Sequence, residues 1–473
     1  MELKRELGLK EVVATVVTSV IGGGLFISTI QIQSKVNVGS AIILSYIIAA
    51  IPAFLMALCY AVLSSALPSS GGEYVFVSRI IDPFIGFIST WARWFAMIAT
   101  IAAMAVGDII LINNFFDVLG MHAAVDFITA NIQIIAIVLV ILFFLINYLG
   151  VKVYGRVQIA MFVLLMLGIS LLIIFGIRNV SLSNLEYSFN FNMENIAMAS
   201  SLIFFSYIGF AAIANAGDEV KEPEKTLPRG ITISMFAIAL AYIFVALVAY
   251  GSMSPSFYDS YDFSSGSVPD LMANFLPASI AVYVAFAGSI AIISDINPMM
   301  LATSRLAFAW ARDKIVPERV AELNKFGVPK WSLAINAIVA IIIIIFAKVF
   351  MNVVMMINMA VLLIYVAIST ATLILPYKHP EIFSKAKFKF SGIWVVALSG
   401  LLLSALFFGY ILQLDGAMPG FLFLLAWIGV GGVVYVATME SHRLPWRIYK
   451  EQKKEKELLD KAMIEKLLKR ARR

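Results

Sequence analysis

The chain has 473 residues, of which 61% are hydrophobic and only 14% are charged, and its formal net charge is +6. Soluble domains carry about 25% charged residues, so this composition predicts a helical membrane protein that crosses the bilayer several times. The single cysteine excludes a disulfide framework, and three histidines argue against a Cys/His metal site. The positive charge does not indicate nucleic acid, because 12 of the 35 Lys and Arg residues follow Glu440 in one tail.

Apolar stretches long enough to span a bilayer recur along the whole chain. A span needs about 20 mainly apolar residues. We expect twelve spans, near 11–32, 40–66, 83–112, 131–149, 153–176, 193–213, 230–251, 278–304, 331–348, 352–375, 392–412 and 419–438. Alternate connections carry almost all Lys and Arg, and the others carry only Lys35, Arg178 and Lys348. Because cytoplasmic loops hold the positive excess, we expect a multi-pass cell-membrane protein with both termini cytoplasmic.

The first and sixth spans are interrupted by glycine at comparable points. The first reads VIGGGLF at 20–26, and the second reads FFSYIGF at 204–210. A helix break at membrane depth frees backbone N–H and C=O groups that lipid cannot satisfy, so it survives where it lines a polar cavity. Matching breaks in the two halves of a chain indicate the substrate site of a transporter.

A pair of broken helices offers groups that suit an amino acid. The carboxylate and the ammonium of an amino acid lie about 3 Å apart. A broken helix presents free N–H groups where its second half begins and free C=O groups where its first half ends. We expect the Gly23 and Gly24 amides to hold the carboxylate, and the carbonyls at 20, 205 and 208 to hold the ammonium. The alternative is that the glycines only permit close helix packing. The residues of this hypothesis are Val20, Gly22, Gly23, Gly24, Phe205, Ile208, Gly209 and Phe210.

Four motifs carry a resemblance to a known family. Residues 21–26 (IGGGLF) are similar to its first-helix motif I-G-x-G-I-F, and 68–74 (PSSGGEY) to its P-x-x-G-G-x-Y motif before the third helix. Residues 209–229 resemble the sixth helix with the loop after it, and 304–317 resemble the end of the eighth helix. In this order and spacing, the chain resembles the amino acid–polyamine–organocation (APC) superfamily of transporters over essentially its full length.

The resemblance implies an architecture. It is an all-α integral membrane protein with the APC (LeuT-type) fold, a five-plus-five inverted repeat with two additional C-terminal helices. The first repeat would occupy 1–176, the second 177–375, the two extra helices 376–440 and a basic cytoplasmic tail 441–473. The apolar residues of the tail recur at helical spacing, so it could lie on anionic lipid or remain a solvated helix.

The resemblance also implies a function and two further features of the site. The chain would carry an amino acid or a related amine by alternating access and would not be an enzyme. Phe205 would be an aromatic gate over the substrate, although an ordinary packed phenylalanine is the alternative. Ala96 and Thr100 on the third span would line the pocket for the substrate side chain.

The coupling residues of some family members are missing here. An acidic position in the sixth helix is Ala211, and a lysine position in the fifth is Leu165. The eighth span instead contains a carboxylate, Asp295, which costs about 2.5–3.5 kcal/mol to place in a bilayer. Such a cost indicates a functional role.

Three hypotheses for Asp295 remain open. It could bind sodium with Ser294 and first-helix carbonyls, with Asn297 nearby; it could bind and release a proton; or it could be structural, for example paired with Arg93. The leading function is therefore an ion-coupled secondary transporter whose only cofactor is a coupling ion, sodium or proton. The alternatives are an exchanger or uniporter, or a transporter-like amino acid sensor. The expected partners are the substrate and the lipid bilayer, not nucleic acid.

Overall fold

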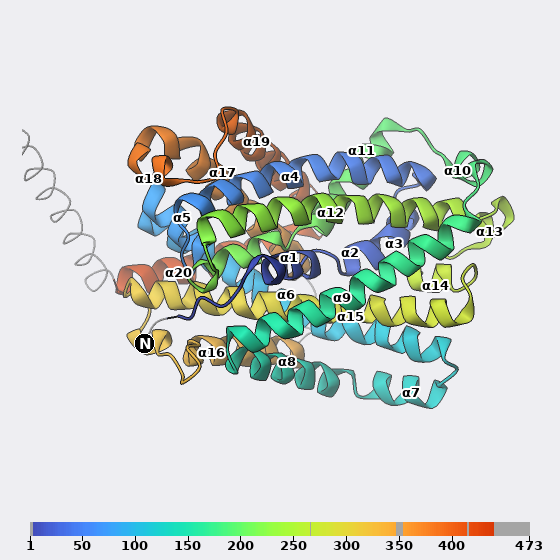
Figure 1. The fold of residues 1–473 in the computed structure, drawn as a ribbon, viewed down its shortest axis with the longest axis horizontal. Helices are drawn as coiled ribbons and strands as arrows, with labels where there is room; N and C mark the ends of the chain where they lie inside the picture. Colours follow the sequence, from blue (N-terminus) through green and yellow to red (C-terminus); the bar gives the residue numbers. More distant parts are fainter. Residues whose placement is uncertain (1–2, 265, 347–352, 414–415, 439–473) are drawn as a thin grey trace, which may run out of the picture.

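The computed structural model describes residues 3–264, 266–346, 353–413 and 416–438, and its regular elements are all helical (Figure 1). The helices are α1 (Leu9–Thr18), α2 (Gly23–Phe26), α3 (Ser28–Lys35), α4 (Ile42–Ala66), α5 (Gly72–Ile80), α6 (Pro83–Val118), α7 (His122–Ala130), α8 (Ile132–Tyr148), α9 (Val151–Gly176), α10 (Leu182–Ser188), α11 (Met193–Phe204), α12 (Pro223–Ser252), α13 (Pro255–Ser260), α14 (Val268–Met272), α15 (Ala278–Arg312), α16 (Lys330–Ile345), α17 (Val353–Lys378), α18 (Pro380–Lys385), α19 (Ile393–Ile411) and α20 (Ala417–Ala437).

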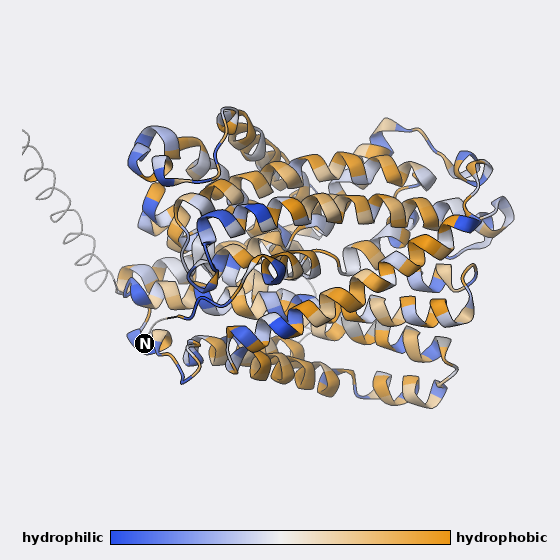
Figure 2. Cartoon of the chain, viewed as in Figure 1, coloured by the Kyte–Doolittle hydropathy of each residue, from blue (hydrophilic) through white to orange (hydrophobic). Residues whose placement is uncertain are grey.

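The long helices are those of a membrane protein. Among the described residues, nine helices are long and apolar enough to cross a bilayer, or ten if α7 and α8, which meet at 81°, form one span. Apolar residues colour the lengths of these helices in Figure 2. A helix occupies each of the twelve stretches expected from the sequence, but the first stretch is divided among α1, α2 and α3, and α16 is short. The count of twelve spans and the division into two repeats stay predictions.

Several helices extend beyond the apolar stretches that predict them. α6 continues to Val118 rather than 112, α12 begins at Pro223 rather than 230, and α15 ends at Arg312 rather than 304. Hydropathy marks only the part of a helix inside lipid, whereas capping groups determine where the helix begins. At α6, for example, the Asp82 carboxylate accepts hydrogen bonds from the N–H groups of Phe84 and Ile85.

The two broken helices lie inside the bundle. α1 packs against α9 and α12, and α12 also packs along α4. On the other side of α1 runs α15, which packs against α6 and α9. Val20, Ile21 and Leu25 of the first break are buried among these helices, and Gly22, Gly23 and Gly24 are partly buried. Irregular backbone is tolerated at membrane depth where it is buried in protein or lines a cavity.

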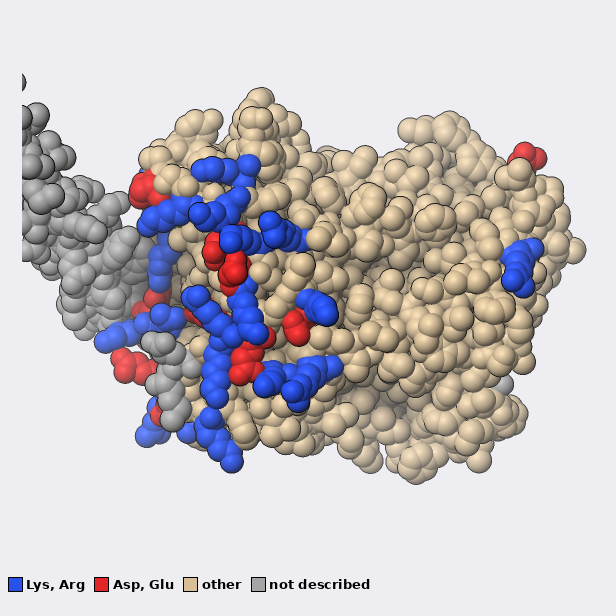
Figure 3. Space-filling view, in the orientation of Figure 1, with Lys and Arg blue, Asp and Glu red and all other residues tan. Residues whose placement is uncertain are grey.

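Charge is distributed unevenly along the bundle. Lys and Arg side chains gather at one end of the face drawn in Figure 3, and few charged residues lie at the other end. The start of α1 and the end of α20 both lie at the charged end (Figure 1). The tail at 441–473 and its predicted contact with anionic lipid lie outside the described residues.

Candidate functional site

The first break separates α1 from α2 and leaves room for a Cβ atom at two of its glycines, Gly22 and Gly23. A Cβ atom on Gly22 would find only the Ala291 carbonyl oxygen, at 3.9 Å, and one on Gly23 would come no closer than 3.8 Å to the Ile27 side chain. Gly23 and Gly24 begin α2, and the leading N–H groups of a helix have no partner within it. These amides are therefore available at the place predicted for the carboxylate.

The second break follows α11 directly. A 3₁₀ turn, η3 (Phe205–Tyr207), leads to an extended residue, Ile208, and a further 3₁₀ segment, η4 (Phe210–Asn215), continues the span. Between them Gly209 has φ +133°, a conformation that only glycine adopts readily. A Cβ atom there would lie 1.7 Å from the Ser19 carbonyl oxygen. The Ser19 hydroxyl in turn donates to the Gly209 carbonyl at 3.2 Å, so the two breaks are in direct contact.

Tyr242 of α12 joins the two breaks. Its hydroxyl oxygen lies 2.9 Å from the Val20 carbonyl oxygen and 2.8 Å from that of Ser206. One hydroxyl proton is thereby shared between carbonyls that both breaks have freed. Because a carbonyl oxygen has two lone pairs, Val20 keeps the capacity to accept a second hydrogen bond.

Gly24 has a different role from Gly22 and Gly23. A Cβ atom on Gly24 would lie 2.5 Å from the Cβ of Ser206 and 2.8 Å from its Cα. Gly24 is therefore needed for packing of the first break on the second. The packing alternative raised from the sequence is therefore supported for Gly24, and substrate binding at Gly22 and Gly23 stays a prediction.

The aromatic residues at the second break lie in different surroundings. Phe205 is half-buried and its ring centre lies 5.6 Å from that of Phe204, which is buried. Phe210 is also buried, with its ring 5.5 Å from Tyr60 and 6.1 Å from Tyr365. Of the two predicted aromatic site residues, Phe205 is thus the more accessible, as a gate requires.

The predicted residues of α6 lie on one face of that helix. Ala96 is fully buried, and the half-buried Thr100 uses its hydroxyl to donate to the Ala96 carbonyl at 2.9 Å. Arg93 is three residues before Ala96 and seven before Thr100, a spacing that puts all three on the same face. Arg93 is 2% exposed.

Asp295 is buried in the middle of α15 with hydrogen-bonding capacity to spare. It is 8% exposed, and its Oδ1 atom has no hydrogen-bond partner among the described residues. Arg93 is close enough for its charge to act on Asp295. The ion pair that Arg93 forms is nevertheless with Glu73, whose Oε1 lies 3.6 Å from the Arg93 Nε.

Ser294 and Asn297 belong to a polar network that joins α1, α8, α9 and α15. The Ser294 hydroxyl lies 3.4 Å from the Thr18 carbonyl oxygen at the end of α1. The Gln158 amide nitrogen donates to the Ser294 carbonyl at 3.1 Å and to the Thr18 hydroxyl. Asn297 receives a hydrogen bond from Asn147 and donates one to Gln158, both at 2.7 Å. Its amide is therefore fully engaged in holding helices together.

On the charged side of the breaks, a buried ion pair joins α15 to the segment after the second break. Arg305 donates from Nε and Nη2 to the Glu219 carboxylate at 2.8 and 2.6 Å, and both residues are 1% exposed. The N-terminal segment lies across the same place, because Lys221 N–H donates to the Leu7 carbonyl at 2.8 Å. A buried bidentate pair of this kind makes a firm closure.

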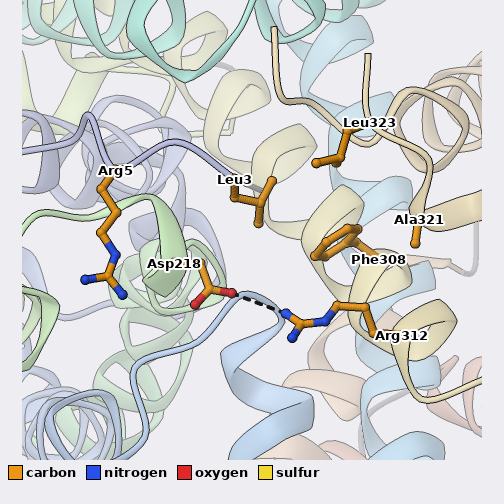
Figure 4. Close-up of a pocket in the computed structure, with 7 residues that line it drawn as sticks. All are labelled: Leu3, Arg5, Asp218, Phe308, Arg312, Ala321 and Leu323. Carbon is orange, nitrogen blue, oxygen red and sulfur yellow. Dashed lines mark ion pairs between the residues drawn. The ribbon is translucent and has the colours of Figure 1, made fainter. Parts of the chain in front are cut away.

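Two cavities lie away from the breaks. One, of about 480 Å³, opens at the charged end beyond this closure, where the Arg312 guanidinium lies 3.5 Å from the Asp218 carboxylate and Arg5 lies on the other side of Asp218 (Figure 4). The other, of about 650 Å³, lies between α11 and α19. Neither is lined by a residue of the two breaks.

The sequence hypothesis did not include Tyr242 or Gln158. Each is a polar residue inside an otherwise apolar span, and that pattern is a usable signal of function or of helix contact. The pattern alone does not tell which face of the helix the residue occupies, so it could not assign either residue to the breaks.

Comparisons with known proteins agree on one family. A family model described as "Amino acid permease" matches residues 7–434. The methylthioribose transporter of Bacillus subtilis (strain 168) is 28% identical over 453 residues, covering 93% of this chain and 95% of that protein. The branched-chain amino acid permease BcaP of the same organism is 27% identical over 458 residues, which cover 93% of this chain and 94% of that protein. The vacuolar cationic amino acid transporter 4 of Arabidopsis thaliana is 27% identical over 409 residues, which cover 80% of this chain and 64% of that protein.

Proposed function

The chain belongs to the amino acid permease family, and from that premise we propose that it is a secondary active transporter of amino acids or related amines that works by alternating access. Members of the family are transporters, so the chain is a transporter and not an enzyme. Its relatives are named as transporters of methylthioribose, of branched-chain amino acids and of cationic amino acids. Family membership therefore supports amino acid transport without selecting one substrate.

The single observation that carries the site is the contact of the two breaks around Tyr242. In the proposed complex the substrate carboxylate binds the leading amides of α2 beside Gly22 and Gly23, where the structure has room. The ammonium binds second lone pairs of the Val20, Phe205 and Ile208 carbonyls. Phe205 covers the bound substrate, which excludes water at a low entropic cost because the ring has few rotatable bonds.

Alternating access requires a route from the breaks to the charged end to open. We propose that the charged end is held shut by the Arg305–Glu219 pair and by the backbone hydrogen bonds of residues 6–7 to residues 219 and 221. Opening toward that end separates this buried pair, and bound substrate must favour the rearrangement by differential affinity for the two states. We place the charged end in the cytoplasm, in agreement with the positive-inside rule.

We propose that Asp295 couples transport to a proton. A buried carboxylate without a hydrogen-bond donor is costly to keep ionised, so it needs a proton or a metal cation. Sodium would be held by Asp295 with Ser294 and the Thr18 carbonyl, which supply the oxygen atoms a hard cation prefers. Two further oxygen atoms at this position, the Ser294 carbonyl and the Thr18 hydroxyl, already accept hydrogen bonds from the Gln158 amide nitrogen, which leaves sodium few oxygen ligands. This arrangement favours the proton.

Reconstitution into proteoliposomes tests the function and its coupling together. The purified chain should catalyse counterflow of the radiolabelled amino acid that gives the largest thermal shift, whereas a sensor would bind the amino acid without turnover. An inward proton gradient should drive accumulation and a sodium gradient should not. If a sodium gradient alone drives accumulation, the proton assignment is wrong.

Asp295→Asn keeps the side-chain volume and removes the charge. It should abolish accumulation under a proton gradient and spare counterflow, because exchange returns the protein with substrate bound. Asp126→Asn changes an exposed carboxylate on α7 and should behave like the parent. Full accumulation by Asp295→Asn would show that Asp295 is not the coupling group, and absence of any gradient effect in the parent would make the protein an exchanger or uniporter.

A further inference from the structure

Arg93 and Tyr365 carry buried donor groups that have no hydrogen-bond acceptor among the described residues. The Nε and Nη2 atoms of Arg93 and the hydroxyl of Tyr365 have no hydrogen-bond partner among the described residues. Arg93 is 2% exposed and Tyr365 is fully buried. Buried donors without partners are strongly unfavourable, and nearly all native examples are paired with protein, water or a ligand.

Arg93 lies one helical turn nearer the charged end than Ala96, and Asp295 lies one helical turn nearer that end than Ala291. On α6, Arg93 precedes Ala96 by one turn on the face that also carries Thr100. On α15, Asp295 follows Ala291 by one turn, and the Ala291 carbonyl faces Gly22. α6 begins and α15 ends at the charged end, so both steps lead in the same direction.

Tyr365 of α17 lies beside the second break. Its ring centre lies 6.5 Å from Phe204 and 6.1 Å from Phe210, the residues that flank the second break. It also lies 6.0 Å from Tyr60, whose hydroxyl donates to Glu73 at 2.6 Å. Arg93 is linked to this group through Glu73, so the free donors of Arg93 and Tyr365 lie together beside the second break.

The charged groups around Arg93 and Tyr365 favour an uncharged hydrogen-bond acceptor for their free donors. Glu73 already balances Arg93, with 3.6 Å between the nearest nitrogen and oxygen atoms. A second carboxylate brought by the substrate would lie near both Glu73 and Asp295 and would be repelled. An uncharged oxygen acceptor meets the donors without adding charge.

We propose that Arg93 and Tyr365 form the floor of the substrate pocket and select amino acids whose side chain ends in an uncharged acceptor oxygen, a carboxamide or a hydroxyl. This inference rests on the proposed function, because it assumes that an amino acid occupies the breaks. A site built to hydrogen-bond a substrate group rejects analogues that lack the group, since its own buried donors then stay unpaired. Aliphatic side chains of the same shape are therefore disfavoured.

Isosteric pairs of amino acids give the sharpest test. Asparagine and leucine have similar shapes, as do threonine and valine, and only the first of each pair offers an acceptor oxygen. Their affinities are measured by thermal shift of the purified full chain and by competition for uptake into proteoliposomes. Asparagine and threonine should bind at least about tenfold more tightly than leucine and valine.

Two conservative variants connect this preference to the floor. Tyr365→Phe removes only the hydroxyl and should reduce the preference within each pair at least about threefold. Arg93→Lys keeps a positive charge beside Glu73, loses the planar array of donors, and should act in the same direction. Tyr410→Phe removes a hydroxyl at the cavity between α11 and α19 and should leave both preferences unchanged.

The outcomes separate this inference from the proposed function. If leucine and valine bind as tightly as asparagine and threonine, or if Tyr365→Phe and Arg93→Lys keep the parent preference, the floor does not select the substrate and the inference is wrong, while the transporter assignment stands. If no amino acid shifts the melting temperature or competes for uptake, the proposed function itself fails.

Discussion

At the residue scale, the three consecutive glycines of the first break serve two purposes. Gly24 lies against the Ser206 backbone and admits no side chain, whereas a Cβ atom on Gly22 or Gly23 would make only ordinary van der Waals contacts. The same residue type is thus required for helix packing at one position and for close approach of a ligand at its neighbours. The two roles can be separated by adding one methyl group.

Gly23→Ala should fold like the parent and bind amino acids at least about tenfold more weakly, because its methyl group enters the space beside the α2 amides. Gly24→Ala should instead lower the melting temperature, since overpacking of a tight contact costs about 1–3 kcal/mol. Thermal unfolding and amino acid binding of both variants provide the check. Unchanged affinity in Gly23→Ala would place the carboxylate elsewhere.

The sequence identified residues of the site by type, and it was limited where side chains of several helices meet. Glycine inside a span and a carboxylate inside a span are unusual enough to stand out, and both Gly23 and Asp295 border or approach the breaks in the structure. Tyr242 and Tyr365 are ordinary residues in a membrane helix, and Arg93, although unusual inside a span, enters the sequence hypotheses only as a partner of Asp295. Their importance comes from the contacts they make with other helices, and these contacts are not visible along one chain.

At the scale of elements, the two broken helices are held together by α12. The Tyr242 hydroxyl is within 2.9 Å of a freed carbonyl from each break. Together with the Ser19–Gly209 hydrogen bond and the packing of Gly24 on Ser206, this contact holds the α2 amides close to the carbonyls of the second break. In the proposed complex the substrate must match that distance, so α12 would act on binding without contacting the substrate itself.

Tyr242→Phe should therefore lower stability by about 1–3 kcal/mol and weaken amino acid binding as well, because two buried carbonyls lose their donor. Tyr250→Phe is a matched control on the same helix, since the Tyr250 hydroxyl donates to the Thr29 carbonyl at 3.1 Å, outside both breaks. It should affect the melting temperature only. Equal losses of binding in the two variants would mean that Tyr242 merely supports the fold.

Hydropathy was sufficient to find where helices lie but not where they begin and end. All twelve expected stretches contain helix, yet α12 begins seven residues earlier than expected and short helices such as α5 and α7 lie in predicted connections. The ends follow from local groups such as the Asp82 cap and Pro223 at the first turn of α12. These groups act in water at the membrane surface, where apolar composition carries no information.

At the scale of the whole molecule, the uneven distribution of charge determines its direction in the membrane. Lys and Arg gather at the end that carries the start of α1, the Arg305–Glu219 closure and the cavity of Figure 4. By the positive-inside rule, we predict that this end lies in the cytoplasm. In the proposed transport cycle, substrate released into the cytoplasm would then pass the Arg305–Glu219 pair.

Cysteine labelling can test this orientation with little background, because the only native cysteine, Cys59, is fully buried. Lys225→Cys places a thiol at the charged end and Ser260→Cys places one on α13 at the other end, and both positions are exposed. In intact cells a membrane-impermeant maleimide should label Ser260→Cys and spare Lys225→Cys, and disruption of the membrane should expose both. Labelling of Lys225→Cys alone in intact cells would reverse the orientation and turn the Arg305–Glu219 pair into an outer closure. The parent protein controls for reaction of Cys59 and should stay unlabelled throughout.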